Sequence, residues 1–411
     1  MAWTLVESSN LRATRDFVVL QVGRIIQVAF SSFAFLIAAR LLGVEGFGLY
    51  STILATLNAT IALADLGLGQ LAVRSVAQHN VGEITGAIAS RTLVYAVAAS
   101  LTVLCTIAVY VLTRGDTLAC GAAALFGISY LVLQARSNVE RGFWLGLLAF
   151  RRAVTIDVLV SAARFVAIAA TASLVTVTVF RIAVASAVSG GIALAVLERF
   201  LRYQLDQESE HRASVIPIAL PFALTSLAWN FLTEWPKLGL AAVSGPAAVG
   251  NLGAAFRVLT LVLIPLQTGL NVLTPRVFAA AGTHDRRALW RGLAVLAAFS
   301  LMLMALTLIG SALVPLLLGA NYRPSVPILR ILAITLPFQA VASVMGDWLG
   351  GIGKQPTRLV ITVIGLALGI PIMTVAAHAR GGSGIAEGYL LTIAGVAVAT
   401  AVLASRSRKP T

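Results

Sequence analysis

Charged side chains are scarce in this chain of 411 residues. Asp, Glu, Lys and Arg make up 11% of it, whereas hydrophobic residues make up 59%. Soluble domains are about 45–50% apolar and about 25% charged, so a soluble fold of this length could not hide its apolar surface and still present a charged exterior. The composition therefore excludes an ordinary soluble enzyme or binding module and indicates a protein surrounded by lipid.

Cysteine is nearly absent too. The two cysteines, Cys105 and Cys120, lie inside apolar segments, so we predict neither a disulfide framework nor a metal site. The sequence has no Gly-rich phosphate loop ending in Gly-Lys-Ser/Thr, and we expect no cofactor. The first 16 residues are polar and precede no small-residue cleavage site, so the first apolar segment is expected to stay as an anchor.

The chain has instead twelve apolar segments, each long enough for a helix to cross a bilayer, which takes roughly 20 residues. This pattern predicts an all-α, polytopic integral membrane protein. A polar linker at 199–212 follows the sixth segment, so we predict two six-helix bundles, 1–205 and 206–411, around a central cavity. The segments run approximately over 17–40, 47–72, 86–112, 117–139, 153–175, 179–198, 214–242, 246–274, 290–318, 326–349, 357–378 and 383–404.

The net charge of +14 indicates how the chain is oriented in the membrane and does not indicate a nucleic-acid partner. The basic residues stand singly or in pairs between apolar segments, and no basic run is interleaved with aromatic residues. With the N-terminus in the cytoplasm, 20 Lys and Arg fall on the inner side, 5 on the outer side and 5 within segments. Cytoplasmic linkers carry such an excess of Lys and Arg, so the bias predicts that both termini are cytoplasmic.

An internal repeat relates the two halves at an offset of 202 residues. In both halves a short Gly-containing outer loop leads into a long helix that ends at an arginine on the inner side. Two bundles of the same orientation are related by an axis along the membrane normal, a geometry that suits alternating access. The matched pairs are Gly43 with Gly245, Gly48 with Gly250, Gly67 with Gly269 and Arg74 with Arg276.

Three stretches of the chain carry a resemblance to a known family. Residues 39–74 contain ARLLG, an acidic-Gly-x-Gly-x-Tyr turn, an Asp-Leu-Gly-Leu-Gly helix end and a following arginine. Residues 343–358 (SVMGDWLGGIGKQPTR) lead into a Gly-Lys-Gln turn, and residues 381–396 form a Gly-rich entry into the last segment. In order and spacing these stretches resemble the polysaccharide-biosynthesis flippases, the O-antigen and exopolysaccharide exporters of the MOP (multidrug/oligosaccharidyl-lipid/polysaccharide) superfamily.

The resemblance implies a function in cell-surface polysaccharide synthesis. Such a flippase moves an undecaprenyl-diphosphate-linked oligosaccharide from the inner to the outer leaflet of the bacterial inner membrane, through a cationic cavity between two bundles. It is no enzyme, since no covalent step is needed. The implied partners are the lipid-linked glycan, the bilayer and other membrane proteins of polysaccharide assembly, and we expect a monomer.

Among the basic residues inside predicted segments, Arg24, Arg164 and Arg257 are the candidates for substrate binding. Arg164 and Arg257 are each about 11 residues into their segment, roughly 16 Å at 1.5 Å per residue and close to the middle of a ~30 Å core. Charges at such depth usually face a bundle interior or a wet cavity, and guanidinium groups bind phosphate oxygens in two-point fashion. We predict that all three contact the diphosphate. The alternatives are carbonyl bonding for Arg257, an ion pair with Asp157 for Arg164, and snorkelling for Arg24.

Other charged residues are candidates for gating or coupling. Glu234 and Lys237 are three residues apart, so they can pair structurally near an outer helix end; the alternative is a gate or a proton-sensitive carboxylate. Asp65 and Asp347 lie near inner helix ends, in the stretches that carry the resemblance, and a structural or gating role is expected there. The full set is Asp65, Asp157, Glu234, Lys237 and Asp347.

Two other functions fit a polytopic protein. A cation-coupled multidrug antiporter of the same superfamily commonly depends on an acidic residue deep in the first helix, but segment 17–40 holds no Asp or Glu and carries Arg24 instead. A polysaccharide polymerase or ligase carries a large periplasmic loop, whereas every outer linker here is about ten residues or fewer. Both alternatives are therefore less favoured than a flippase.

Overall fold

The computed structural model describes most of the chain. Every regular element in the described part is a helix, and the predicted all-α class is confirmed. The described residues are 2–64, 66–68, 91–146, 150–172, 177–202, 216–283, 286–352 and 354–406.

The chain forms two compact units. Unit 1 comprises Met1–Leu42 and Thr56–Leu227, and unit 2 comprises Gly43–Ala55 and Ala228–Thr411. The segment Gly43–Ala55 therefore belongs in sequence to the first half but packs within unit 2. The predicted boundary between 1–205 and 206–411 falls in 203–215, outside the described residues, and stays a prediction.

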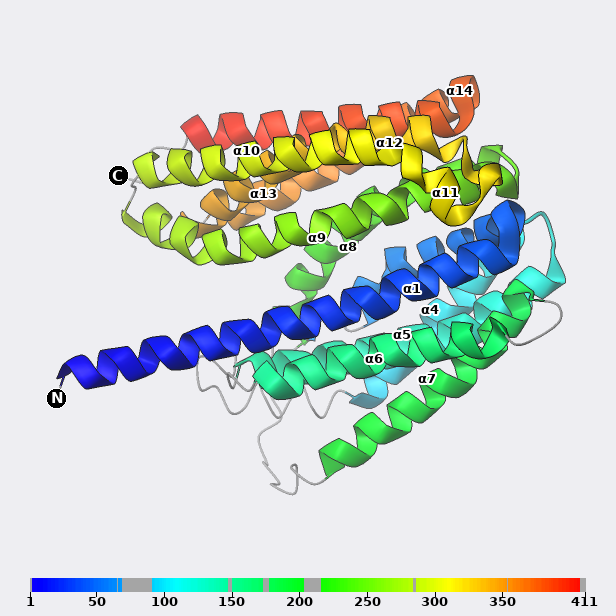
Figure 1. Ribbon diagram of the computed structural model, residues 1–411, viewed down its shortest axis with the longest axis horizontal. Coiled ribbons are helices and arrows are strands. Elements are labelled where there is room, and N and C mark those ends of the chain that lie inside the picture. The colour runs from blue at the N-terminus through cyan, green and yellow to red at the C-terminus, as the bar shows by residue number, and fades with distance from the viewer. Residues whose placement is uncertain are drawn as a thin grey trace. The chain divides into compact units, whose positions relative to one another are not determined.

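The helices of unit 1 pack around α5, which contacts α4, α6 and α7 (Figure 1). A tight turn ends α4, with Arg114 and Gly115 both at positive φ. Asp116 then caps the start of α5, because its carboxylate accepts the backbone N–H groups of Leu118 at 2.9 Å and Ala119 at 3.1 Å. The elements are α1 (Ala2–Ala64), α4 (Arg91–Leu112), α5 (Thr117–Gly146), α6 (Phe150–Ala172) and α7 (Val179–Arg202).

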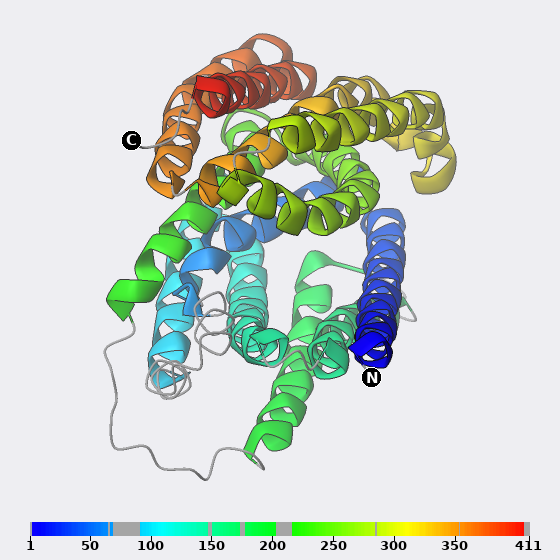
Figure 2. The ribbon, with the colours of Figure 1, turned by 90° about the vertical axis from the view of Figure 1, so that its left-hand side faces the viewer.

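The helices of unit 2 pack around α13, which contacts α9, α10 and α14, as Figure 2 shows. A broken stretch of short helices separates α10 from α13, where Gly319 adopts positive φ. The elements are α8 (Ile216–Val243), of which the part up to Leu227 belongs to unit 1, α9 (Pro246–Thr283), α10 (Arg286–Gly310), α11 (Val314–Leu318), α12 (Ser325–Ala333), α13 (Thr335–Gly351) and α14 (Gln355–Arg406), with 3-10 turns at Ser311–Leu313 and Ala320–Tyr322.

Nine stretches within the described residues are long and apolar enough to cross a membrane. Two of them, Ile25–Ala64 and Pro356–Arg406, have 40 and 51 residues, about 60 and 75 Å of helix, which is at least twice a ~30 Å core. Each contains one glycine with non-helical backbone, Gly43 at φ 64° and Gly381 at φ 59°. These are the positions where the sequence predicts a short outer loop between two crossings, and the structure compresses each loop into a kink.

A close backbone crossing inside unit 2 joins residues related by the 202-residue offset. A Cβ built on Gly48 would overlap the carbonyl oxygen of Pro246, and a Cβ built on Gly250 would overlap the carbonyl oxygen of Val44. Val44 and Pro246 are themselves one repeat apart, so the two contacts are equivalent. Both glycines are needed because any side chain would push the two backbones apart.

Candidate functional site

A ladder of polar side chains runs along one face of α5. Tyr130, Gln134 and Asn138 follow one another at four-residue spacing, so they lie on the same side of the helix. All three are half-buried, whereas most of their neighbours on α5 are buried and small or apolar. Tyr130 is near the middle of the span Thr117–Gly142, roughly 20 Å from its start.

Two neighbouring helices complete this ladder. Arg164 of α6 donates from Nη2 to Oε1 of Gln134 at 2.8 Å, and its Cζ lies 4.1 Å from the ring centroid of Tyr130. Gln134 in turn donates from Nε2 to Oδ1 of Asn138 at 3.0 Å. The Tyr130 hydroxyl donates to Oδ1 of Asn58 on α1 at 2.5 Å. We call these five residues the polar seam; all of them belong to unit 1.

Two members of the seam, Arg164 and Gln134, have hydrogen-bonding capacity to spare. A guanidinium group carries five N–H donors and an amide side chain has two donors and two acceptor sites. Within the described part of the chain, Arg164 uses one donor, and Gln134 uses one donor and one acceptor site of its side chain. Polar groups left unsatisfied at membrane depth are costly, so this half-buried surface requires water or a polar cargo.

The sequence left open an ion pair between Arg164 and Asp157, and the structure does not form it. Asp157 lies seven residues before Arg164 on α6, but its Oδ2 accepts a hydrogen bond from Nε of Arg141 at 2.9 Å, and this pair is partly exposed. Arg164 turns to Gln134 and Tyr130 instead. Contacts between helices therefore outweighed the proximity of Arg164 and Asp157 along one helix.

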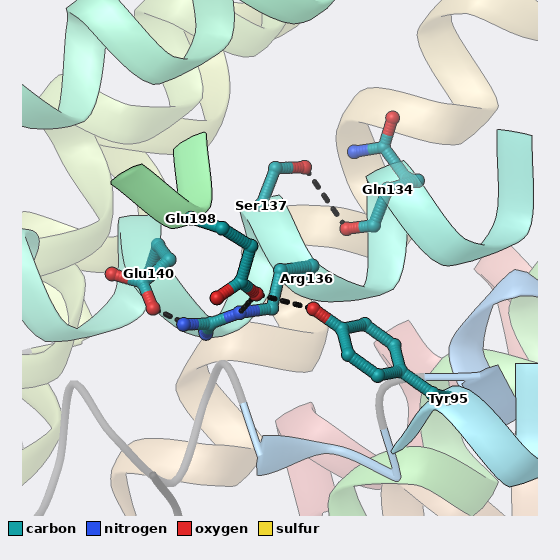
Figure 3. Close-up of polar contacts among 6 residues, drawn as sticks. All are labelled: Tyr95, Gln134, Arg136, Ser137, Glu140 and Glu198. Carbon is teal, nitrogen blue, oxygen red and sulfur yellow. Dashed lines mark hydrogen bonds and ion pairs between the residues drawn. The ribbon is translucent and has the colours of Figure 1, made fainter. Parts of the chain in front are cut away.

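A second polar cluster, centred on Arg136, is deeply buried and was not predicted (Figure 3). Arg136 is 2% exposed; its Nε donates to Oε1 of Glu198 at 2.9 Å and its Nη1 pairs with Glu140. Tyr95 donates its hydroxyl proton to the same Glu198 oxygen. These contacts between side chains link α4, α5 and α7. In the sequence, the four-residue spacing of Arg136 and Glu140 was the pattern from which this ion pair could have been predicted.

In unit 2, the structure forms the ion pair expected between Glu234 and Lys237 on α8. The Lys237 ammonium lies 5.7 Å from the Phe256 ring centroid, and Phe256 meets Tyr389 edge-on at 5.3 Å. Both charged side chains are largely buried, at 15% and 14% exposure. Arg257, the residue after Phe256 on α9, is half-buried.

The remaining candidates lie near helix ends or outside the described residues. Asp347 of α13 accepts a hydrogen bond from Arg358 of α14 at 3.2 Å, a contact that links the two ends of the Gly-Lys-Gln turn. Arg24 lies in α1, but its side chain is outside the described part, and Asp65 is outside it altogether. The structure thus brings Arg164 together with Tyr130 and Gln134 of α5 and, through Tyr130, with Asn58 of α1.

The fold defines the class of protein. The chain is similar to a MATE-family multidrug resistance transporter of the MOP superfamily in an inward-facing conformation, with a TM-score of 0.77, 18% identity, and 94% of this chain and 97% of that chain covered. An outward-facing structure of such a transporter matches with a TM-score of 0.66, 17% identity, and 95% and 94% coverage. The chain is therefore a multi-pass membrane protein with the MOP transporter fold.

The family follows from a second comparison. Residues 13–281 match the family model described as polysaccharide biosynthesis protein, so the chain belongs to that family. A comparison with curated proteins gives no match. Family and fold together support a membrane exporter of the polysaccharide-biosynthesis group, as the resemblance in the sequence indicated.

Proposed function

We propose that this protein moves an undecaprenyl-diphosphate-linked oligosaccharide from the inner to the outer leaflet of the bacterial inner membrane by alternating access. The observation that carries the proposal is Arg164, a half-buried arginine at mid-span depth with one of its five donors used within the described residues. Such a group suits an anionic, hydroxyl-rich cargo. It would repel the cationic drugs that a multidrug antiporter exports.

The cargo chemistry explains why several arginines are useful. A lipid diphosphate is anionic, and guanidinium groups bind its oxygens with short, charge-assisted hydrogen bonds. In a cavity of lowered dielectric these contacts gain strength. We propose Arg257 and Arg24 as diphosphate contacts. The polyprenyl tail stays in lipid while the head group crosses, so no bond is made or broken.

The charged pairs are proposed to act in gating or coupling. The pair of Glu234 with Lys237 lies within α8. The pairs of Asp157 with Arg141 and of Asp347 with Arg358 each join two helices, so a movement of one helix against the other would separate them. Asp65 is proposed for the same role from its sequence context. Both termini are proposed to be cytoplasmic, and the protein to act as a monomer with other polysaccharide-assembly proteins.

The function is tested in proteoliposomes and in cells. Purified protein should move undecaprenyl diphosphate bearing the oligosaccharide that accumulates when the gene is deleted, measured by the accessibility of the glycan to an external lectin or glycosidase. Arg257→Ala should reduce this movement at least about 10-fold, because a charge-assisted hydrogen bond contributes roughly 1.5–3 kcal/mol. Membrane abundance of the variant should stay unchanged.

The control for Arg257→Ala is Arg330→Ala. Arg330 is also an arginine within a span of unit 2, but it is exposed and donates to Ser311 Oγ at 3.0 Å. Export should survive this change. Ethidium efflux by the wild type, without movement of the lipid-linked oligosaccharide, would replace the flippase by a multidrug antiporter.

A further inference from the structure

We propose that the polar seam of unit 1 is a sugar-binding subsite that contacts the glycan of the cargo and leaves the diphosphate to other residues. This inference rests on the proposed function and refines it, since it assigns the seam to one part of the substrate. It rests on the contacts of Tyr130, Gln134 and Arg164 within the described residues.

The first argument is the mixture of donors and acceptors. A diphosphate in its ionised form offers acceptor oxygens only. The seam, however, presents a second acceptor site on Gln134 Oε1 and the lone pairs of the Tyr130 hydroxyl, in addition to the donors of Arg164 and Gln134. A sugar hydroxyl donates and accepts at once, so it matches this set, whereas a diphosphate would leave the acceptors without a partner.

The second argument is the way in which Arg164 is held. One face of its guanidinium group lies on the Tyr130 ring, and one of its Nη2 donors is given to Gln134. A two-point grip on a diphosphate through this edge would compete with the Gln134 bond. The other edge of the guanidinium group keeps its donors, so Arg164 can give hydrogen bonds to sugar hydroxyl groups from a side chain that is already fixed in place.

The third argument is the shape of the ladder. Tyr130, Gln134 and Asn138 extend over two turns of α5, about 12 Å. An extended row of neutral polar groups matches a chain of sugar rings better than it matches a compact, doubly charged head group. The seam therefore has the means to distinguish glycans, with Gln134 at its centre.

Gln134→Leu tests the inference, because leucine is close in size and removes the hydrogen-bonding groups. Three probes are compared by calorimetry in nanodiscs: the accumulated lipid-linked oligosaccharide, the free oligosaccharide released from it by mild acid, and undecaprenyl diphosphate without sugar. Binding of both sugar-bearing probes should weaken about 10-fold, the loss expected for an unpaired buried polar group. Binding of undecaprenyl diphosphate should be unchanged.

Two further variants keep the result interpretable. Gln339→Leu is the same substitution in a span of unit 2, where the amide donates to Thr335 Oγ1 at 3.0 Å; it should leave all three affinities unchanged. Tyr130→Phe keeps the ring beneath Arg164 and removes the hydroxyl, and it should also weaken the sugar-bearing probes alone. It carries the test if Gln134→Leu does not fold.

Two outcomes overturn the inference while the flippase function stands. In the first, the wild type binds the lipid-linked oligosaccharide and the seam variants Gln134→Leu and Tyr130→Phe bind it equally well. The other is an equal loss for undecaprenyl diphosphate, which would make the seam a diphosphate site. If the wild type binds and moves no lipid-linked oligosaccharide at all, the proposed function fails and the inference fails with it.

Discussion

Arg136 shows how a charged side chain can serve the fold of a membrane protein. It lies at 2% exposure between carboxylates from its own helix and from α7. A buried pair of this kind need not stabilise more than an apolar replacement of both partners, but removing one partner leaves a buried charge and costs about 3–5 kcal/mol. The cluster thus makes the packing of α4, α5 and α7 strongly dependent on a single residue.

Arg136→Met should therefore destabilise the protein severely, because Glu198 and Glu140 lose the cation between them. We expect a fall of the unfolding midpoint in detergent by at least several degrees, measured by intrinsic fluorescence, together with lower abundance in the membrane. Tyr95→Phe removes one neutral donor to Glu198 and should cost about 1 kcal/mol. A midpoint unchanged in Arg136→Met would show that the cluster contributes nothing to stability.

Single residues also mark the limit of prediction from sequence. The sequence places Arg164 inside an apolar segment, but its partners depend on how α5 and α6 are rotated against each other, which no spacing within one helix reveals. Arg136 lies three residues before the predicted end of its apolar segment at 139, where an arginine is expected to face the inner side. The helix itself runs on to Gly146, so Arg136 lies more than two turns before its end.

At the scale of elements, glycines decide where helices meet and bend. The sequence predicted one apolar segment on each side of Gly43 and one on each side of Gly381. The structure keeps both pairs of segments and joins the two members of each pair through one non-helical residue. It also breaks the expected tenth segment into α12 and α13. Local patterns predicted that glycine-rich loops exist, whereas their compression into kinks depends on the packing of the flanking helices.

Gly48→Ala should disturb the close crossing, because the added methyl group would overlap the carbonyl oxygen of Pro246. Backbone atoms cannot move aside as a side chain can, so we expect a loss of about 1–3 kcal/mol, measured as the unfolding midpoint in detergent. Gly310→Ala is the control, since its Cβ would meet nothing within 4 Å. Equal stability of the two variants would contradict the crossing.

The whole molecule was the most predictable level. Lipid as a solvent demands helices with internally satisfied backbones, so composition and segment length were enough to predict the all-α membrane class, and the described helices overlap all twelve predicted segments. The division into units was less predictable: Gly43–Ala55 packs within unit 2 although it belongs to the first half of the sequence. The long-range packing of one helical segment leaves no periodic signal in the sequence.

The orientation of the whole chain can be measured by cysteine labelling. In a background with Cys105→Ala and Cys120→Ala, we expect a membrane-impermeant maleimide added to intact cells to label Arg323→Cys and not Arg286→Cys. The excess of Lys and Arg on the predicted inner side is the physical reason. The reverse pattern would place both termini outside and overturn the assignment of leaflets.

The equivalent contacts at Gly48 and Gly250 have the form of a two-fold symmetric dimer interface, in which each side supplies the same groove and the same protrusion. A true dimer must encode both sides with one sequence. Here each side has its own sequence, and the residue that faces each glycine differs. Because the facing atom is a backbone carbonyl oxygen, Val44 and Pro246 can serve equally well. The contact leaves no room for a side chain on either side, and glycine occupies both positions.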